Sequence, residues 1–245
     1  MDATTNTSGE ARPVSVAVGD VTLSGDLVTP PRARGVVLFA HGSGSSRHSP
    51  RNQFVARELQ AGGLATLLID LLTPAEEAID LRTRHLRFDI GLLAERLVGA
   101  VDWLTKQPET RDVRIGLFGA STGAAAALIA AAERPQVVGA VVSRGGRPDH
   151  AGPQVLGRVR APTLLIVGGD DAPVIQMNRA AFDELRTTKA LEIVPGATHL
   201  FEEPGALEHV ARLARAWFLR YLSPKNQLDA ASVPRIDQRV DEATS

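Results

Sequence analysis

A serine lies at the centre of a glycine-flanked motif. Residues 119–123 read Gly-Ala-Ser-Thr-Gly, which fits the pattern Gly-x-Ser-x-Gly. The apolar segment Val113–Phe118 precedes this motif, and the alanine-rich segment Thr122–Ala132 follows it. Where a strand turns sharply into a helix at such a motif, the serine hydroxyl is exposed and the start of the helix favours developing negative charge. We therefore predict that Ser121 is a nucleophile; the alternative is a glycine-rich turn without chemistry.

The residues that would activate this serine follow it in the chain. A serine nucleophile needs a base, the base needs an orienting acid, and in a strand–helix fold of this kind the order is Ser, Asp or Glu, then His. Asp170 and Asp171 follow an apolar segment, and the pattern Gly-x-x-Asp-x-x-Val favours Asp171 as the acid, with Asp170 as a turn or capping residue. His199 follows the last predicted strand and is the predicted base. The alternative is that both aspartates only cap a helix.

The segment after Gly35–Ala40 reads His-Gly-Ser-Gly-Ser-Ser and is a candidate oxyanion loop. A tetrahedral intermediate needs two backbone N–H donors at its oxygen. We predict that Thr122, the residue after the nucleophile, supplies one of them. Ser43 is the preferred second donor and Gly44 the next choice, because glycine lets this backbone approach the substrate closely. His41 is expected to support the loop through hydrogen bonds.

These residues must be positioned by elements whose patterns alternate along the chain. The predicted strands cover Val14–Val18, Val21–Leu27, Gly35–Ala40, Ala65–Ile69, Val113–Phe118, Val137–Ser143, Pro162–Val167 and Ala190–Val194. The predicted helices cover Arg51–Ala61, Asp89–Gln107, Thr122–Ala132 and Ala206–Leu222, the last with Val210, Leu213, Trp217 and Tyr221 on one stripe. Strands that alternate with amphipathic helices predict an α/β fold with a mostly parallel sheet and helices on both faces. Active residues of such sheets lie beyond the carboxyl ends of the strands.

Length and composition narrow the class of protein. The 245 residues allow one large domain or two small ones, and the ordered turns between residues 41 and 199 require one. We place the domain at residues 13–223, between polar segments at 1–12 and 224–245. The chain has no cysteine, which excludes disulfides, zinc–cysteine sites and a cysteine nucleophile. A formal net charge of −1 argues against nucleic-acid binding.

No segment predicts export or a membrane span. Met1 to Arg12 is polar, without a basic start followed by an apolar stretch, so we expect no secretory signal. The longest uncharged run, Ile115 to Ala132, has 18 residues, the lower limit for a membrane helix. Glycines and hydroxyl residues interrupt this run, and we interpret it as a strand that turns into a buried helix. A cytoplasmic protein without membrane contact is expected.

Taken together, these turns resemble those of the α/β-hydrolase superfamily. Within it, the chain is similar to the dienelactone-hydrolase-like branch of small hydrolases without a lid, over about residues 13–223. The resemblance rests on His41-Gly42-Ser43-Gly44 and on the turns of Ser121, Asp171 and His199. It implies an α/β-hydrolase fold and a catalytic triad. Dienelactone hydrolases carry cysteine as the nucleophile, whereas this chain has serine, so the resemblance implies a serine esterase with a different substrate.

We predict hydrolysis of small to medium carboxylic esters through an acyl-enzyme, with no metal and no organic cofactor. A thioesterase, an amidase or an acyltransferase would use the same residues. A hydrolase-fold module that only binds a ligand is an alternative of another class. The connection Arg144–Ala161 is too short for a helical cap domain, which favours an open site and disfavours a long-chain lipase.

Four arginines lie near the predicted site. Arg47 and Arg51 follow the oxyanion loop, and Arg144 and Arg147 follow a strand end. Arg144 and Arg147 are candidate substrate-binding residues that would clamp a carboxylate or phosphate. The alternative, which we favour in an arginine-rich chain, is that these arginines fix loops or are solvated. The mixed-charge segment Leu71–Arg87 also follows a strand end; we expect it to wrap the surface rather than to border the site.

Overall fold

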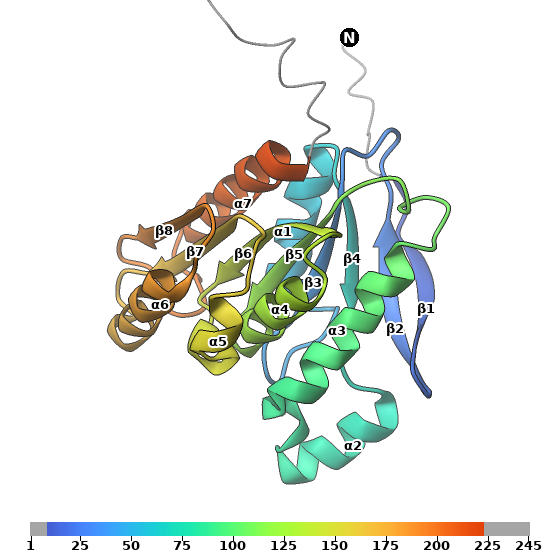
Figure 1. The fold of residues 1–245 in the computed structure, drawn as a ribbon, viewed down its shortest axis with the longest axis horizontal. Coiled ribbons are helices and arrows are strands. Elements are labelled where there is room, and N and C mark those ends of the chain that lie inside the picture. The colour runs from blue at the N-terminus through green and yellow to red at the C-terminus, as the bar shows by residue number, and fades with distance from the viewer. Residues whose placement is uncertain (1–8, 223–245) are drawn as a thin grey trace, which may run out of the picture.

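An eight-stranded sheet forms the centre of the protein. A computed structural model of the 245-residue chain describes residues 9–222. The strand order is β1-β2-β4-β3-β5-β6-β7-β8, and Figure 1 shows helices covering both faces of the sheet. The predicted C-terminal tail, residues 224–245, and most of the predicted N-terminal segment lie outside the described residues. Within that predicted segment, strand β1 already begins at Arg12.

The elements follow the predicted alternation. The strands are β1 (Arg12–Val18), β2 (Val21–Val28), β3 (Val36–Ala40), β4 (Ala65–Ile69), β5 (Ile115–Ala120), β6 (Val138–Arg144), β7 (Thr163–Gly168) and β8 (Lys189–Val194). The helices are α1 (Pro50–Ala61), α2 (Pro74–Thr83), η1 (Leu86–Phe88), α3 (Ile90–Leu104), α4 (Thr122–Glu133), η2 (Pro148–Ala151), α5 (Pro153–Leu156), α6 (Ala172–Glu184) and α7 (Ala206–Leu222).

The sheet is mostly parallel, as predicted. β2 pairs antiparallel with both β1 and β4, and every other pair of neighbouring strands is parallel. The opening hairpin turns at Gly19, which has φ +53°. β5 lies between β3 and β6, so the strand that carries the predicted nucleophile is central. The ends of β3, β5, β6 and β7 therefore meet at one edge of the sheet.

Two apolar cores lie on opposite faces of the sheet. One core joins α3, α4, α5 and α6 to alternate strand residues such as Leu38 and Leu117. The other joins α1 and α7 to the residues between them, such as Phe39 and Phe118. In Figure 1, α3 to α6 lie in front of the sheet while α1 and α7 lie behind it. Burial on both faces explains why these strands are apolar on successive residues.

The final helix packs with a different stripe from the one predicted. The buried residues of α7 include Val210, Ala214, Phe218 and Leu222, at spacings of four. Trp217 is only partly buried, and its indole N–H donates to Pro162 O at 3.1 Å. The small side chain of Ala214, and Gly116 beneath the Phe218 ring, let α7 approach the sheet closely. The larger residues of the predicted stripe are only partly buried at the border between α7 and the sheet.

The segment after β4 forms a helix, α2, that the sequence analysis did not identify. Thr73 caps α2 by accepting from the Glu76 N–H at 3.2 Å, while the Glu76 carboxylate accepts from the Thr73 N–H at 2.7 Å. This reciprocal capping box starts the helix. Asp80 is buried and forms an ion pair with Arg87. An ion pair between Glu76 and Arg96 at 2.9 Å joins α2 to α3.

Within residues 9–222, no separate lid covers the sheet. Between β6 and β7, the chain forms only η2 and the single turn α5. The short connection was predicted to exclude a helical cap domain, and the structure confirms this. Among residues 9–222, no helix combines the length and the apolar character that crossing a membrane requires. The cytoplasmic location stays a prediction.

The contact between α7 and the sheet gives a stability prediction. Phe218 is fully buried, and a methyl group placed on Gly116 would lie 2.7 Å from its ring, so the ring rests on the β5 backbone. Replacing Phe218 with alanine removes a large buried side chain and leaves a cavity. We expect Phe218→Ala to lower the free energy of unfolding by about 3–5 kcal/mol, measured by urea denaturation.

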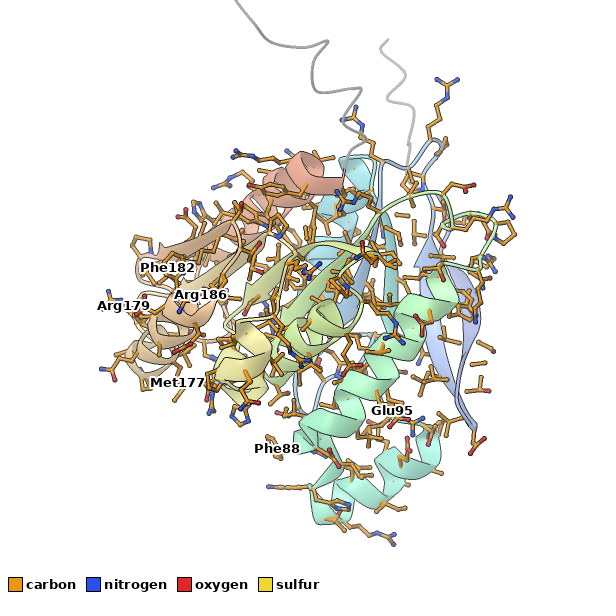
Figure 2. All side chains as sticks on the ribbon, viewed as in Figure 1. Phe88, Glu95, Met177, Arg179, Phe182 and Arg186 are labelled. Carbon is orange, nitrogen blue, oxygen red and sulfur yellow. The ribbon has the colours of Figure 1, made fainter. Side chains whose placement is uncertain are left out.

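Phe88 is the matched control for this substitution. It is 55% exposed and lies in η1, before α3, as labelled in Figure 2. We expect Phe88→Ala to change the free energy of unfolding by no more than about 0.5 kcal/mol. Equal losses for the two variants would contradict the proposed role of the α7 contact.

Candidate active site

Ser121 lies in a strained turn between β5 and α4. Its backbone angles are φ +50° and ψ −121°, a conformation that L-residues rarely adopt. Two hydrogen bonds hold it there: the Ser121 N–H donates to Arg144 O at 3.3 Å, and the Arg147 N–H donates to Ser121 O at 3.0 Å. The neighbouring strand end therefore determines this conformation. Strain of this kind persists only where the surrounding structure imposes it, and it is typical of functional sites.

The glycines on either side of the serine are required by close backbone contacts. A methyl group on Gly119 would lie 2.4 Å from the Ala124 Cα. A methyl group on Gly123 would lie 2.3 Å from Ala40 O. Both contacts are far shorter than van der Waals distance and involve backbone atoms. Glycine at these positions lets α4 begin directly against the ends of β3 and β5.

Asp171 and His199 form a hydrogen-bonded pair. Asp171 Oδ2 lies 2.7 Å from His199 Nδ1. Asp171 precedes α6 in the capping position, yet its side chain accepts no capping hydrogen bond. The carboxylate is directed to the imidazole instead. Asp170, the alternative acid, is exposed, and its N–H donates to Ala197 O at 3.0 Å.

Ser121 and His199 line one cavity. This cavity has a volume of about 210 Å³ and is bordered by the oxyanion loop, the turn after β5, the end of β6 and the loop after β8. The His199 imidazole bonds to Asp171, and it makes no direct hydrogen bond to the Ser121 hydroxyl. Catalytic hydrogen bonds are often long without substrate and tighten in the complex. The hydroxyl and the imidazole thus share one cavity, as a proton transfer between them would require.

The predicted oxyanion donors lie together beside the serine. Thr122 is the first residue of α4, and the first N–H groups of a helix have no acceptor within it. The Ser43 N–H instead donates to the Thr122 hydroxyl oxygen at 3.0 Å. Gly44, the second choice, has φ +70° and lines a smaller neighbouring cavity together with Ser43. A substrate oxygen bound by the Ser43 N–H must therefore share it with Thr122 or displace the hydroxyl.

His41 supports this loop, as the sequence suggested. Its Nε2 accepts a hydrogen bond from the Leu71 N–H at 3.2 Å, and its Nδ1 lies 2.9 Å from Gly42 O. Because Nε2 accepts while Nδ1 faces a carbonyl, the ring is neutral with its proton on Nδ1. Burial lowers the pKa of His41, in agreement with the neutral form. The imidazole connects the loop after β3 to the end of β4.

Arg47 fixes the same loop through two acids. Its backbone N–H donates to Asp70 at 2.7 Å, its guanidinium pairs with the same carboxylate, and its Nε lies 3.3 Å from Asp26. This is the loop-fixing role that we favoured for the arginines. Asp70 was not singled out in the sequence. Its position directly after β4, at the catalytic edge of the sheet, is the signal that could have identified it.

Most of the segment Leu71–Arg87 is exposed, as expected, and none of its residues lines the cavity shared by Ser121 and His199. A cavity of about 30 Å³ is lined by the oxyanion loop together with Leu72, Glu77, Asp80 and Arg87. The charges of this segment thus face the back of the oxyanion loop. Among residues 9–222, no three His, Asp or Glu side chains are grouped as ligands of a metal ion would be.

The two candidate substrate-binding arginines differ in their contacts. Arg147 makes a two-pronged ion pair with Asp149, at 3.0 and 2.9 Å, and does not line the 210 Å³ cavity. Arg144 lines that cavity and is only 7% exposed. Arg51 also lines it and pairs with Glu202 at 2.9 Å. Of these arginines, only Arg144 and Arg51 line the cavity beside Ser121.

The strand order, the strained serine turn and the aspartate–histidine pair define an α/β-hydrolase fold. The family comparison gives a narrower assignment. The family model described as "Dienelactone hydrolase family" matches residues 24–222. The chain therefore belongs to the dienelactone hydrolase family.

Individual relatives agree with this assignment. The crystal structure of a dienelactone hydrolase from Anabaena variabilis is 67% identical, with a TM-score of 0.86, over 87% of this chain and 98% of that one. A dienelactone hydrolase-like promiscuous phosphotriesterase from metagenomic libraries is 21% identical, with a TM-score of 0.72, over 87% of this chain and 99% of that one. At that identity the likeness concerns the fold alone.

The curated relatives are longer proteins. Two strains of Mycobacterium tuberculosis have a protein named "Putative phosphoribosyl transferase" that is 56% identical over 209 residues. The match covers 85% of this chain and 46% of those proteins. The chain thus spans about half the length of the curated relatives that it matches.

The close contact at Gly123 gives a prediction for the site. In Gly123→Ala, the new methyl group must push the start of α4 away from Ala40, which moves Thr122 relative to Ser121. Because misplacement of about 1 Å can cost about 100-fold in rate, we expect labelling of Ser121 by a fluorophosphonate probe to slow by about that factor. Labelling is followed by intact-protein mass spectrometry.

Gly91→Ala is the matched control. Gly91 is exposed in the first turn of α3, and a methyl group there meets only the Asp89 carboxylate at 3.4 Å. This variant is expected to label at the wild-type rate. If Gly123→Ala is labelled at the wild-type rate, the start of α4 tolerates the displacement and the prediction is contradicted.

Proposed function

We propose that this hydrolase is a serine esterase that cleaves small to medium carboxylic esters through an acyl-enzyme. The observation that carries the proposal is the 2.7 Å contact between Asp171 and His199, at a cavity that Ser121 also lines. A carboxylate bound to Nδ1 leaves Nε2 as the nitrogen that can accept a proton. The strained turn of Ser121 supports the assignment of this hydroxyl as the nucleophile.

In the proposed mechanism, His199 takes the proton of Ser121 as its Oγ attacks the ester carbonyl carbon. Asp171 keeps the imidazole oriented and stabilises its charged form. The N–H groups of Thr122 and Ser43 hold the oxygen of the tetrahedral intermediate. His199 then gives the proton to the leaving alcohol, and a water molecule activated by the same base cleaves the acyl-enzyme. None of these steps calls for a metal or an organic cofactor.

The volume of the cavity beside Ser121 limits the acyl group that it can hold. Its 210 Å³ is below the range of about 300–1,000 Å³ that is usual for ligand pockets. In the part of the chain that the structure describes, no lid adds apolar surface above this cavity. Both features favour short acyl groups over long ones.

Thioesters, amides and acyl transfer would use the same residues, and product analysis with an added alcohol separates transfer from hydrolysis. A module that only binds a ligand is disfavoured because serine, acid and base are all present in the required order. We do not assign phosphoribosyl transfer to this chain, because the matched segment is less than half of the proteins that carry that name.

The nucleophile is tested by covalent labelling. We expect a fluorophosphonate probe to add one equivalent to the wild-type protein and none to Ser121→Ala, as measured by intact-protein mass spectrometry. Tryptic mapping should place the adduct on Ser121. A folded wild-type protein without an adduct would falsify the assignment.

The choice of acid is tested by two neighbouring substitutions. Asp171→Asn replaces the acceptor of the His199 Nδ1 proton with an amide and favours the wrong tautomer. We expect kcat for 4-nitrophenyl acetate to fall by up to about 10⁴-fold. Asp170→Asn changes an exposed residue of the same turn, and its kcat should stay within a factor of about two of wild type. A larger loss in Asp170→Asn than in Asp171→Asn would reverse the assignment.

A further inference from the structure

A buried asparagine joins α6 to the loop after β6. Asn178 is fully buried, and its Nδ2 donates to Gly146 O at 2.9 Å and to Val174 O at 2.8 Å. Val174 lies one turn earlier in the same helix, so only the bond to Gly146 links separate elements. Because both acceptors are carbonyl oxygens, the orientation of the amide is fixed: its nitrogen faces them and its oxygen does not.

The oxygen of this amide is unsatisfied. Oδ1 of Asn178 is enclosed by protein and accepts no hydrogen bond from residues 9–222. A buried oxygen without a donor costs stability. The fold therefore gains less from this side chain than its two donated bonds suggest, and a buried group of this kind calls for a reason beyond stability. The contacts of the loop that Asn178 holds supply such a reason.

This loop, residues 145–147, contacts the turn of the nucleophile. The Arg147 N–H donates to Ser121 O at 3.0 Å. Gly146 lies against the first turn of α4, since a methyl group on it would lie 2.5 Å from the Ala124 Cβ. A displacement of the loop would therefore move both the backbone of the serine and the start of the helix that follows it.

The same loop contacts the histidine loop, and the helix that holds it carries the acid. A methyl group on Gly145 would lie 3.0 Å from His199 O and 3.5 Å from His199 Nδ1. Asp171 immediately precedes α6, the helix of Asn178, and its carboxylate is bound to His199. Residues 145–147 thus lie between the segments that carry the nucleophile, the acid and the base.

We propose that Asn178 is a positioning residue for the reaction. By holding Gly146, it keeps the loop after β6 in the place that aligns Ser121 with the aspartate–histidine pair. The inference rests on the proposed esterase function. Asn178 does not line the 210 Å³ cavity and acts only through the loop, so its loss should slow the chemical step without weakening ligand binding.

The kinetic test uses two substitutions at this position. Asn178→Leu keeps the shape of the side chain and removes both donated bonds. Asn178→Ser has a hydroxyl that can donate to Val174 O within the helix, but it is too short to reach Gly146. For both variants, we expect the maximal rate of inactivation by a fluorophosphonate probe, kinact, to fall by about 10- to 100-fold. The inhibition constant KI should stay at the wild-type value.

Phe218→Ala is the matched control. Phe218 is fully buried in the core on the other face of the sheet, so its loss destabilises the fold without touching the loop after β6. Its kinact should equal that of wild type. All variants are compared well below their Tm, and near-ultraviolet circular dichroism shows which of them are folded. A wild-type kinact in either folded Asn178 variant would overturn the proposal, so the test stands even if one of the two does not fold.

Hydrogen exchange separates this inference from the esterase proposal. The readout is the exchange rate of the Arg147 amide, which donates to Ser121 O, divided by that of the buried Leu117 amide in β5. We expect this ratio to rise by about 10-fold or more in both Asn178 variants, because the loop then opens without the sheet. It should not rise in Phe218→Ala. An unchanged ratio in the Asn178 variants overturns the inference whether or not an ester is hydrolysed, whereas an unlabelled wild-type protein overturns the esterase proposal.

Discussion

The register of five parallel strands, β3 and β5 to β8, is the constraint on which the site depends. Ala40 pairs with Gly119, Ala120 with Arg144, Arg144 with Ile166, and Gly168 with Val194. Their carboxyl ends therefore lie side by side, and each loop that follows must turn within a few residues. A shift by one residue would move every one of these side chains to the opposite face of the sheet. The two apolar cores that flank the sheet oppose such a shift.

This register also explains why glycine recurs at the catalytic edge. When strand ends lie in line, the loops after them compete for the same space. A methyl group on Gly168 would lie 2.4 Å from Ala197 O, which brings the acid turn against the histidine loop. A methyl group on Gly145, which has φ +51°, would lie 3.0 Å from the His199 carbonyl oxygen, so the loop after β6 also lies against the histidine loop. The backbone is therefore held by contacts rather than by long side chains, and small displacements at one loop reach the next.

The sequence predicted the central strands β3 to β7 well because each is buried on both faces, which follows from helices covering the sheet on two sides. The turns of Ser121, Asp171 and His199 were predictable because each combines a required residue type with a required position after a strand. The helix after β4 was missed, because α2 is weakly amphipathic and depends on its capping box. The stripe of α7 was misassigned because periodicity alone does not show that Ala214 and Phe218 fit against glycine. Contacts across the fold, such as Asp70 with Arg47, are not visible in local patterns.

The arginines at this edge of the sheet differ in whether a carboxylate balances their charge. Arg47 and Arg147 each find a carboxylate, so their charges are already balanced and they order loops. Arg144 differs from them: it is buried, and its Nε and Nη1 donate to no acceptor among residues 9–222. A surface ion pair contributes little to stability, whereas a buried charge without a partner is costly. The end of β6 therefore keeps a charge that the described fold does not balance.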